Sequence, residues 1–218
     1  MKAVLWVCVT IVTLFYSCKE RQNGPLADEP AVTQLFSQPE IEDLHRIISF
    51  VDSIALEHSD ASQMNEVYHD FFDSLVVIMS TTSHDDICIE EKIRDNFFET
   101  IKPSGVFDEI WISKNPRKIR TRDTTIVNPK FYYSLDINNQ GRFVDLLNLL
   151  KEKDSIFSPP YQSITESGGL APTLIGSMYN HQIFDFEKGS HRLWGAIYYL
   201  SQERSVEARL PELLKQGG

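Results

Sequence analysis

The chain has 218 residues, of which 42% are hydrophobic and 11% aromatic, a composition typical of a globular protein with its own core. Asp and Glu outnumber Lys and Arg by 31 to 21, so the formal net charge is −10. Nucleic acids and anionic lipid headgroups bind to basic surfaces. The charge therefore argues against a nucleic-acid-binding protein and against purely electrostatic attachment to a membrane.

The first residues of the chain have the pattern of a secretory signal. Lys2 supplies a positive charge, and residues 4–16 form an uncharged, largely apolar run. A membrane-crossing helix needs about 20 apolar residues. This run is shorter and ends abruptly at Cys18 and Lys19, so we predict that residues 1–17 are a cleavable signal peptide and not an anchor. The alternatives are a core helix over residues 4–16 and a signal that is cut elsewhere.

The end of the run, Leu14-Phe15-Tyr16-Ser17-Cys18, resembles the lipobox of bacterial lipoproteins. Ser17 is the small residue that precedes the cysteine, whereas Phe15 and Tyr16 stand where the family usually has an aliphatic and a small residue. The resemblance implies cleavage before Cys18 by signal peptidase II, a diacylglycerol on the Cys18 thiol and an acyl chain, such as palmitate, on the new amine. Several acyl chains make a stable membrane anchor, at about 0.8 kcal/mol per buried CH₂ group.

Such processing changes the charge and the cysteine content of the chain. Removal of residues 1–17 takes away Lys2 and makes the mature net charge one unit more negative than −10. Cys8 leaves with the signal and Cys18 carries the lipid, so Cys88 is the remaining thiol. A single thiol cannot form an intramolecular disulfide, and the fold must therefore depend on its core.

We predict a tether followed by one domain. Residues 18–36 comprise the lipidated cysteine and a polar segment with Gly and Pro but without helical or strand periodicity, which is typical of a flexible linker. Residues 37–218 are predicted to form a single globular domain. Its pattern indicates a mostly helical α+β fold, with an N-terminal three-helix layer, a small central antiparallel sheet and further C-terminal helices.

Apolar residues recur at intervals of three and four in three successive segments, which predicts helices over residues 39–58, 61–79 and 85–101. The expected inward residues of the first helix are Ile41, Leu44, Ile48, Val51 and Ala55. Those of the second are Met64, Val67, Phe71, Leu75 and Ile78. Those of the third are Ile87, Ile93, Phe97 and Ile101.

The pattern then changes to short runs of β-branched and aromatic residues. These runs predict strands over residues 106–113, 124–128 and 131–137. Helical spacing returns over residues 142–153 and 190–203. The Pro- and Gly-rich residues 155–182 are predicted to be irregular except for a short helix near residues 172–179, and long irregular segments are often functional loops.

The densest group of potential ligands runs from Ser83 to Glu91 and includes His84 and Cys88. A metal site or an activated thiol would use such residues, but a zinc site would need two more nitrogen or sulfur ligands than the local sequence supplies. The same residues suit the start of a helix, with Ser83 as the cap and acidic side chains near the positive end of the helix dipole. We favour the helix start and predict no metal and no cofactor.

Two further sets of residues have the types that catalysis requires. His69, Asp70 and Asp73 place an imidazole and a carboxylate one helical turn apart, as a general base requires and as a solvated helix face also allows. A hydrolase triad could be drawn from Ser163, Ser167, His181, Ser190 and His191. The sequence contains no HExxH, GxSxG, P-loop or paired CxxC motif, so it predicts no catalytic residue.

Five basic residues fall within a short stretch of this acidic chain: Lys114, Arg117, Lys118, Arg120 and Arg122. One interpretation is a solvated turn whose charges protect a sheet edge from pairing. The other is a docking patch for an acidic partner or a phosphate-bearing surface. Because no aromatic residue lies within the stretch, it does not have the pattern of a single-stranded nucleic-acid site. These five residues are the candidate partner-binding site.

The sequence therefore favours a membrane-tethered lipoprotein that acts as a binding or interaction module in the cell envelope. One version is an immunity or inhibitor protein that covers a toxin or a hydrolase. We expect lipid on Cys18 to hold it to a membrane, with the outer membrane favoured and the domain facing the periplasm or the exterior. We expect a protein partner and no nucleic acid. The alternatives are an envelope hydrolase whose site is assembled only in the fold, and a structural envelope component.

Overall fold

The computed structural model describes Gly24, Leu26, residues 29–127, Pro129, residues 132–169 and residues 180–216, with side chains given as far as residue 211. The described chain is mostly helical with a small amount of antiparallel strand, which confirms the predicted α+β class. The predicted signal peptide and Cys18 lie outside the described residues. Among the described helices, none combines the length and the apolar character that crossing a membrane requires.

The α-helices are α1 (Pro30–Leu35), α2 (Gln38–Leu56), α3 (Met64–Thr81), α4 (Glu91–Ile101), α5 (Val106–Ile110), α6 (Arg142–Lys151), α7 (Ser158–Ser167), α9 (Gly189–Leu200) and α10 (Val206–Gln216). The short 3₁₀ helices are η1 (His84–Ile87), η2 (Lys102–Ser104), η3 (Ser155–Phe157) and η4 (His181–Ile183). The strands are β1 (Trp111–Lys114), β2 (Lys118–Arg120), β3 (Thr125–Val127) and β4 (Ser134–Ile137).

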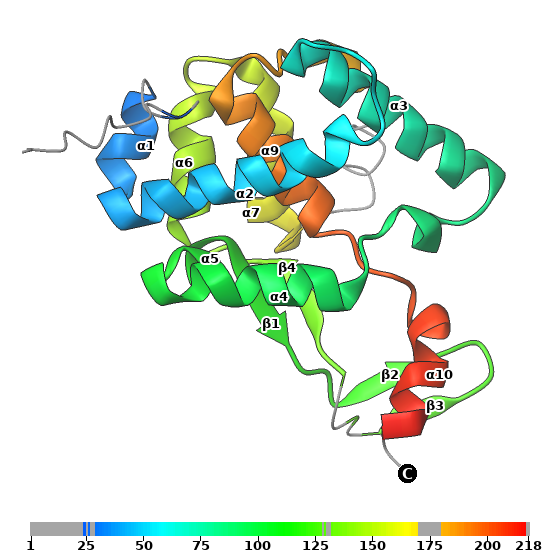
Figure 1. Ribbon diagram of the computed structural model, residues 1–218. Helices are drawn as coiled ribbons and strands as arrows, with labels where there is room; N and C mark the ends of the chain where they lie inside the picture. Colours follow the sequence, from blue (N-terminus) through cyan, green and yellow to red (C-terminus); the bar gives the residue numbers. More distant parts are fainter. Residues whose placement is uncertain are drawn as a thin grey trace, which may run out of the picture.

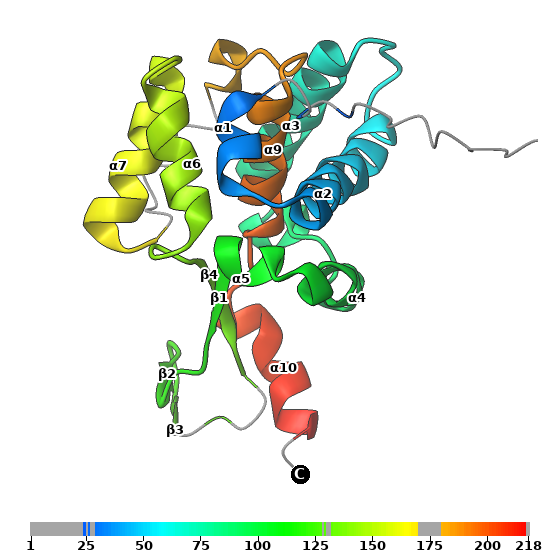
Figure 2. The same ribbon diagram turned by 90° about the vertical axis from the view of Figure 1, so that its left-hand side faces the viewer.

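The long helices form one body around α9. Figure 1 shows α1, α2, α3, α6, α7 and α9 gathered together, with α4 and α5 beneath them and the small strands and α10 at the far end, and Figure 2 shows the same separation from the side. α9 lies against α2, α6 packs on α7, and α1 packs on α6. Nearly every residue of α9 is buried, as expected of a helix with apolar contacts on all sides.

α2 follows the sequence closely. Pro39 occupies its first turn, where no backbone N–H is needed, and the Glu40 carboxylate accepts hydrogen bonds from the N–H and the hydroxyl of Ser37 at 2.8 and 2.7 Å. All five residues predicted to face inward are buried. In α3 the predicted residues Val67, Phe71 and Leu75 are buried too. The sequence therefore identifies the core faces of both helices.

The predicted tether reaches too far along the chain. Residues 30–36, expected to be flexible, contain helix α1, in which Ala31 and Val32 are buried, and Phe36 is buried directly after it. These apolar side chains are too few to show a helical period in the sequence, but they complete the core beside α6. Leu26, before α1, is fully buried as well, and its N–H donates to His45 Nε2 at 3.3 Å. The flexible tether remains a prediction only for the residues that precede Gly24.

The predicted third helix is two elements. η1 ends at Ile87, and α4 begins at Glu91 after a short extended stretch. The predicted inward residues Ile87 and Ile101 are buried, but Ile93 is 49% exposed. The prediction for Ile93 is wrong because the buried face of α4 passes through Arg94, Phe98 and Ile101, so that the polar Arg94 takes the inward position next to Ile93.

The strand predicted over residues 106–113 is also wrong in its first half. Val106, Phe107 and Ile110 form the buried face of the short helix α5, which begins after Gly105, whose φ of +88° is a left-handed conformation that favours glycine. β1 follows and pairs antiparallel with β4, with Trp111 opposite Ile137. β2, which lies in a region expected to be a turn, pairs antiparallel with β3. The strands form two separate two-stranded pairs and not one sheet.

The C-terminal third contains more helix than predicted. The segment 155–182 was expected to be largely irregular, but it contains η3 and α7, with prolines in the first turn of α7, where the helix tolerates them. The short helix predicted near residues 172–179 lies outside the described residues. α10 was not predicted as a helix at all.

Candidate partner-binding site

Three of the five basic residues, Lys118, Arg120 and Arg122, lie on a hairpin made by β2 and β3, Arg117 directly precedes it, and Lys114 ends β1. Side chains of a strand alternate between its two faces, so Lys118 and Arg120 share one face and Ile119 takes the other. Lys118 and Arg120 are exposed, whereas Ile119 is only 4% exposed and lies opposite Ile126. Because Ile119 is buried on one face of the hairpin, Lys118 and Arg120 point to the solvent on the other face.

The tip of the hairpin is closed by local hydrogen bonds. The Thr121 N–H donates to the Thr124 carbonyl at 2.9 Å, and the Thr124 N–H donates to the Thr121 hydroxyl at 3.0 Å. Arg122 and the acidic Asp123 lie exposed within this turn. The cations are therefore held on a defined hairpin, which Figure 1 places at the end of the molecule away from α1.

Four of the five predicted residues form a free cluster, and the fifth does not. The side chains of Arg117, Lys118, Arg120 and Arg122 are exposed and make no ion pair with another described residue. Lys114 instead forms an ion pair with Asp136 on β4, with an Nζ–Oδ2 distance of 2.7 Å. We call the four unpaired residues the basic hairpin cluster.

A groove adjoins the hairpin on the side of α4 and α5. One hollow of about 470 Å³ is lined by Asp95, Phe98, Glu99, Lys102, Phe107, Ser113, Lys114, Asn115, Tyr133 and Leu135. A second, of about 460 Å³, is lined by Lys102, Phe107, Asp108, Trp111, Ile112, Ser113 and Asn138. Because the two share Lys102, Phe107 and Ser113, they make one continuous groove along β1.

The groove has an apolar floor and a polar rim. The Lys102 ammonium lies 2.5 Å from Glu99 Oε1 and 5.3 Å from the centre of the Phe107 ring. The Tyr133 hydroxyl donates to Asp95, and burial raises the pKa of Tyr133 to about 12, so the phenol is neutral at physiological pH. On this rim Lys102 is paired with Glu99, whereas the exposed Asp108 forms no ion pair with a described residue.

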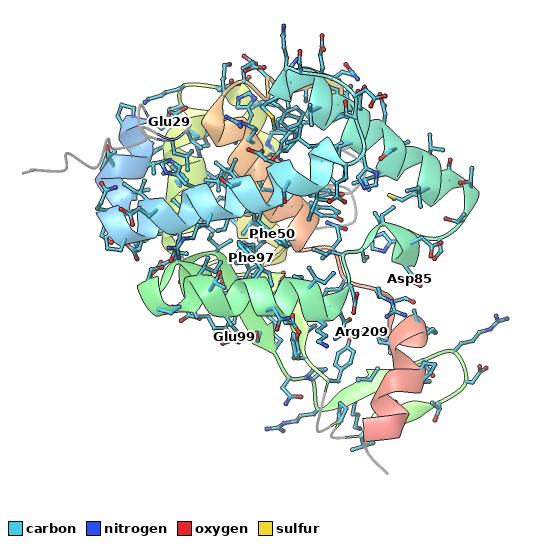
Figure 3. All side chains as sticks on the ribbon, in the orientation of Figure 1. Glu29, Phe50, Asp85, Phe97, Glu99 and Arg209 are labelled. Atoms are coloured by element: carbon cyan, nitrogen blue, oxygen red, sulfur yellow. The ribbon has the colours of Figure 1, made fainter. Side chains whose placement is uncertain are left out.

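A buried ionic network holds the strands and α10 against α4. Arg209 of α10 lies 2.6 Å from Glu91 of α4 and donates a 3.0 Å hydrogen bond to the Tyr133 carbonyl. Glu203 accepts a 3.0 Å bond from the Leu135 N–H, and Arg94 donates to the carbonyl of Gln202 at 3.3 Å. In Figure 3 the labelled Arg209 lies between α4 and α10. This network positions one wall of the groove.

The acidic group from Ser83 to Glu91 has a structural role. Asp85 accepts hydrogen bonds from the N–H and, at 2.9 Å, the hydroxyl of Ser205, the residue before α10. His84 lies 3.2 Å from the Gln202 side chain. Burial raises the pKa of Cys88 to about 12, so its thiol is not activated. Among the described residues, no three His, Cys, Asp or Glu side chains are placed to hold a metal ion.

A histidine that the sequence did not connect to His69 lies beside it. His69 Nδ1 is 2.9 Å from Nδ1 of His181, and Nε2 of His181 is 3.0 Å from Asp73 Oδ1. Asp70 instead bonds to the Ser59 hydroxyl at 2.5 Å. Burial, and then the neighbouring His181, lower the pKa of His69. Because His69 and His181 are far apart in the chain, no local spacing could have indicated this pair.

The residues drawn into a hydrolase triad are not brought together. His191 is buried and bonds to Asp154 at 3.2 Å and to the Asp185 N–H at 2.9 Å. The Ser190 hydroxyl donates to Glu29 at 3.1 Å. Ser167 bonds to the carbonyl of Gly169 at 3.0 Å. Each of these side chains serves a separate local contact.

Cys18, the predicted lipid attachment site, lies outside the described residues, so its role remains a prediction. Comparison with known proteins assigns no family: no protein-family model, no curated protein and no solved structure matches this chain.

Proposed function

We propose that this protein is a membrane-tethered binding module of the cell envelope whose basic hairpin cluster contacts an acidic partner protein. The observation that carries the proposal is the set of four exposed cations without an ion-pair partner among the described residues, in a chain whose net charge is −10. An immunity or inhibitor protein that covers its target is one form of such a module. Neither a cofactor nor a metal is part of the proposal.

The chemistry of the cluster favours carboxylates as its targets. Three of its four residues are arginines, whose planar guanidinium groups bind carboxylates through two parallel hydrogen bonds. An exposed ion pair contributes about 0.2–1 kcal/mol, so four pairs together contribute about 1–4 kcal/mol to binding. This is enough to decide affinity and to direct a partner to this end of the molecule, but it requires other contacts for tight binding.

The proposal is tested by reversing charge on the hairpin and elsewhere. We expect Lys118→Glu with Arg120→Glu to raise the Kd for poly-L-glutamate by about tenfold, since attraction at two sites becomes repulsion. The matched control is Lys92→Glu with Lys153→Glu, two exposed lysines, one on α4 and one just after α6, whose reversal changes the net charge equally. Equal losses in both double variants, or no loss in either, would contradict a specific role of the hairpin.

The tether is tested at its predicted attachment residue. If Cys18 carries lipid, Cys18→Ala should abolish labelling of the protein by a palmitate analogue and should leave an unprocessed precursor in cells. The matched control is Cys8→Ala, because Cys8 lies within the predicted signal and carries no lipid in the mature chain. Continued labelling of the Cys18→Ala protein would end the lipoprotein interpretation.

A hydrolase is the second candidate, because Asp73, His181 and His69 form a hydrogen-bonded chain. If Asp73 accepts a hydrogen bond from Nε2 of His181, and Nδ1 of His181 accepts one from Nδ1 of His69, then Nε2 of His69 carries no proton and can act as a general base. Under this alternative His69→Ala should abolish hydrolysis of an activated ester and leave poly-L-glutamate binding unchanged. The binding proposal expects no ester hydrolysis that depends on His69.

A further inference from the structure

β1 has a free edge whose main-chain groups point toward the groove. The Asn138 N–H donates to the Ile110 carbonyl at 2.9 Å, which fixes the phase of the β1–β4 pair. Since directly bonded residues alternate along an antiparallel pair, Ile112 and Lys114 direct their main-chain groups at β4, and Ser113 directs its groups away. No described residue takes up the N–H or carbonyl of Ser113, whereas the N–H of Trp111, which also faces outward, donates to the Phe107 carbonyl. The edge is therefore open for another strand at Ser113.

The groove adjoins Ser113. Ser113 lines both hollows, Trp111 and Ile112 line the second, and Tyr133 and Leu135, on the β4 side, line the first. Phe107 forms part of the floor of both hollows. Ile112 is 42% exposed there. An apolar side chain carried on an added strand would therefore find an apolar surface next to free hydrogen-bonding groups.

The basic hairpin cluster begins a few residues beyond the open edge. The chain continues from Ser113 through Asn115 to Arg117 and Lys118. Both of these cations are exposed and form no ion pair with a described residue. Because a chain spans at most about 3.6 Å per residue, Arg117 lies no more than about 14 Å from Ser113, a distance that about four residues of an extended peptide can cover. The nearest cations are thus within reach of a peptide that continues beyond the end of β1.

We propose that the partner contributes an extended acidic segment that adds to the free edge of β1, places a large apolar side chain in the groove and reaches the basic hairpin cluster with its carboxylates. This inference rests on the proposed binding function and names the form of its ligand. Main-chain hydrogen bonds to Ser113 hold the added strand, and the groove and the cations bind its alternate side chains. Other complexes formed by strand addition combine affinity and specificity in this way.

The first test uses a random-peptide display library selected on the wild-type protein. We expect the recovered peptides to carry a large apolar residue about four positions from two or more Asp or Glu residues. Their Kd is then measured for Ser113→Pro, which removes the outward N–H, and for Ser113→Thr, which keeps it. Proline is compatible with an edge strand where its nitrogen faces away from the neighbouring strand. The Kd should rise about tenfold or more for Ser113→Pro and change less than about twofold for Ser113→Thr.

A second measurement does not depend on the folding of a variant. Single N-methyl groups are introduced along the recovered peptide, and each peptide is titrated against the wild-type protein. Affinity should fall at alternate positions, because an added strand directs every second N–H toward β1.

The outcomes separate this inference from the proposed function. If binding depends on Lys118 and Arg120 but shows neither the alternation nor the effect of Ser113→Pro, the added strand is wrong and the binding module stands. If the recovered peptides are not acidic, if they bind equally to the variant with Lys118→Glu and Arg120→Glu, or if none binds, both proposals fail.

Discussion

Arg142 is the residue that joins the start of the described chain to the rest of the domain. Its guanidinium donates to the Leu35 carbonyl at 2.8 Å, bonds to the buried carboxylate of Glu40 and lies 5.1 Å from the centre of the Phe36 ring. It also forms an ion pair with Glu109 at 3.1 Å. One side chain thereby ties α1, α2 and α5 to α6, and its loss would leave Glu40 buried without a counter-charge.

We expect Arg142→Met to lower the free energy of unfolding by about 2–3 kcal/mol in urea denaturation, which is below the range for fully buried pairs because the Arg142 side chain is 35% exposed. The matched control is Lys153→Met, which removes an exposed charge shortly after the same helix and should change stability by less than about 0.5 kcal/mol. Equal effects of the two substitutions would show that the Arg142 contacts contribute nothing specific.

The same pair makes stability depend on acid. The hydrogen bond from Arg142, opposed by burial, holds the pKa of Glu40 down at about 2, compared with 4.5 for an ordinary glutamate. Because the folded-state pKa is the lower one, this stabilisation is complete above pH 4.5 and is lost as the pH falls through about 2. The free energy of unfolding, measured by denaturation at several pH values across this window, should depend less steeply on pH in Glu40→Gln than in Glu42→Gln. Glu42 is an exposed neighbour of Glu40 on α2. Identical pH profiles would exclude Glu40 as the acid-sensitive group.

At the scale of residues, the sequence predicted groups that lie close in the chain and failed where partners are distant. The basic stretch was visible because its members are neighbours, but the pairing of Lys114 with Asp136 depends on the β1–β4 register. In the same way, spacing along α3 suggested His69 with Asp73 but could not supply His181, which comes from η4 and lies between them. Composition indicates charge, and only the fold shows which charges remain unpaired.

Polar contacts attach the first part of α10. Asp85 from η1 bonds to Ser205, the residue before the helix, and Arg209 bonds to Glu91 and to the Tyr133 carbonyl. Elements held in this way open locally before the domain unfolds.

We expect Asp85→Ala to weaken the docking of α10 by about 1 kcal/mol, the usual net contribution of a hydrogen bond, because Asp85 holds Ser205, whose hydroxyl accepts from the Ala208 N–H and caps the helix. Hydrogen exchange of the α10 amides should become about fivefold faster. The matched control is Asp86→Ala, since Asp86 is exposed and has the same charge, but its side chain makes no hydrogen bond or ion pair with a described residue. Exchange of the α9 amides should be unchanged in both variants. Unchanged exchange of α10 in Asp85→Ala would mean that the cap does not hold the helix.

At the scale of elements, periodicity predicted α2, α3, α6 and α9 because each has a long apolar stripe. It failed for short elements in which composition and context disagree. Val106, Phe107 and Ile110 are residue types that favour strands, yet they pack as one turn of helix after Gly105. Pro159 and Pro160 suggested a loop, but both lie where the start of α7 needs no backbone donor. Tertiary packing decided these segments.

The whole molecule separates the start of the described chain from the basic hairpin cluster. In both views α1 lies on the helical body, and the hairpin and α10 lie at the opposite end (Figures 1 and 2). A chain anchored through lipid on Cys18 would thus present the hairpin away from the membrane surface. This arrangement suits a module that meets a partner protein. The sequence predicted the charge of this surface, and its position relative to α1 follows only from the fold.

The most direct test of the central claim is the salt dependence of binding to poly-L-glutamate. Screening shortens electrostatic interactions from about 30 Å at 0.01 M to about 3 Å at 1 M ionic strength, so the Kd of the wild-type protein should rise steadily across this range. A variant with glutamate in place of Arg117, Lys118, Arg120 and Arg122 should bind weakly throughout and lose that dependence. A wild-type Kd that does not change with salt, or the same dependence in the variant, would contradict binding through the hairpin.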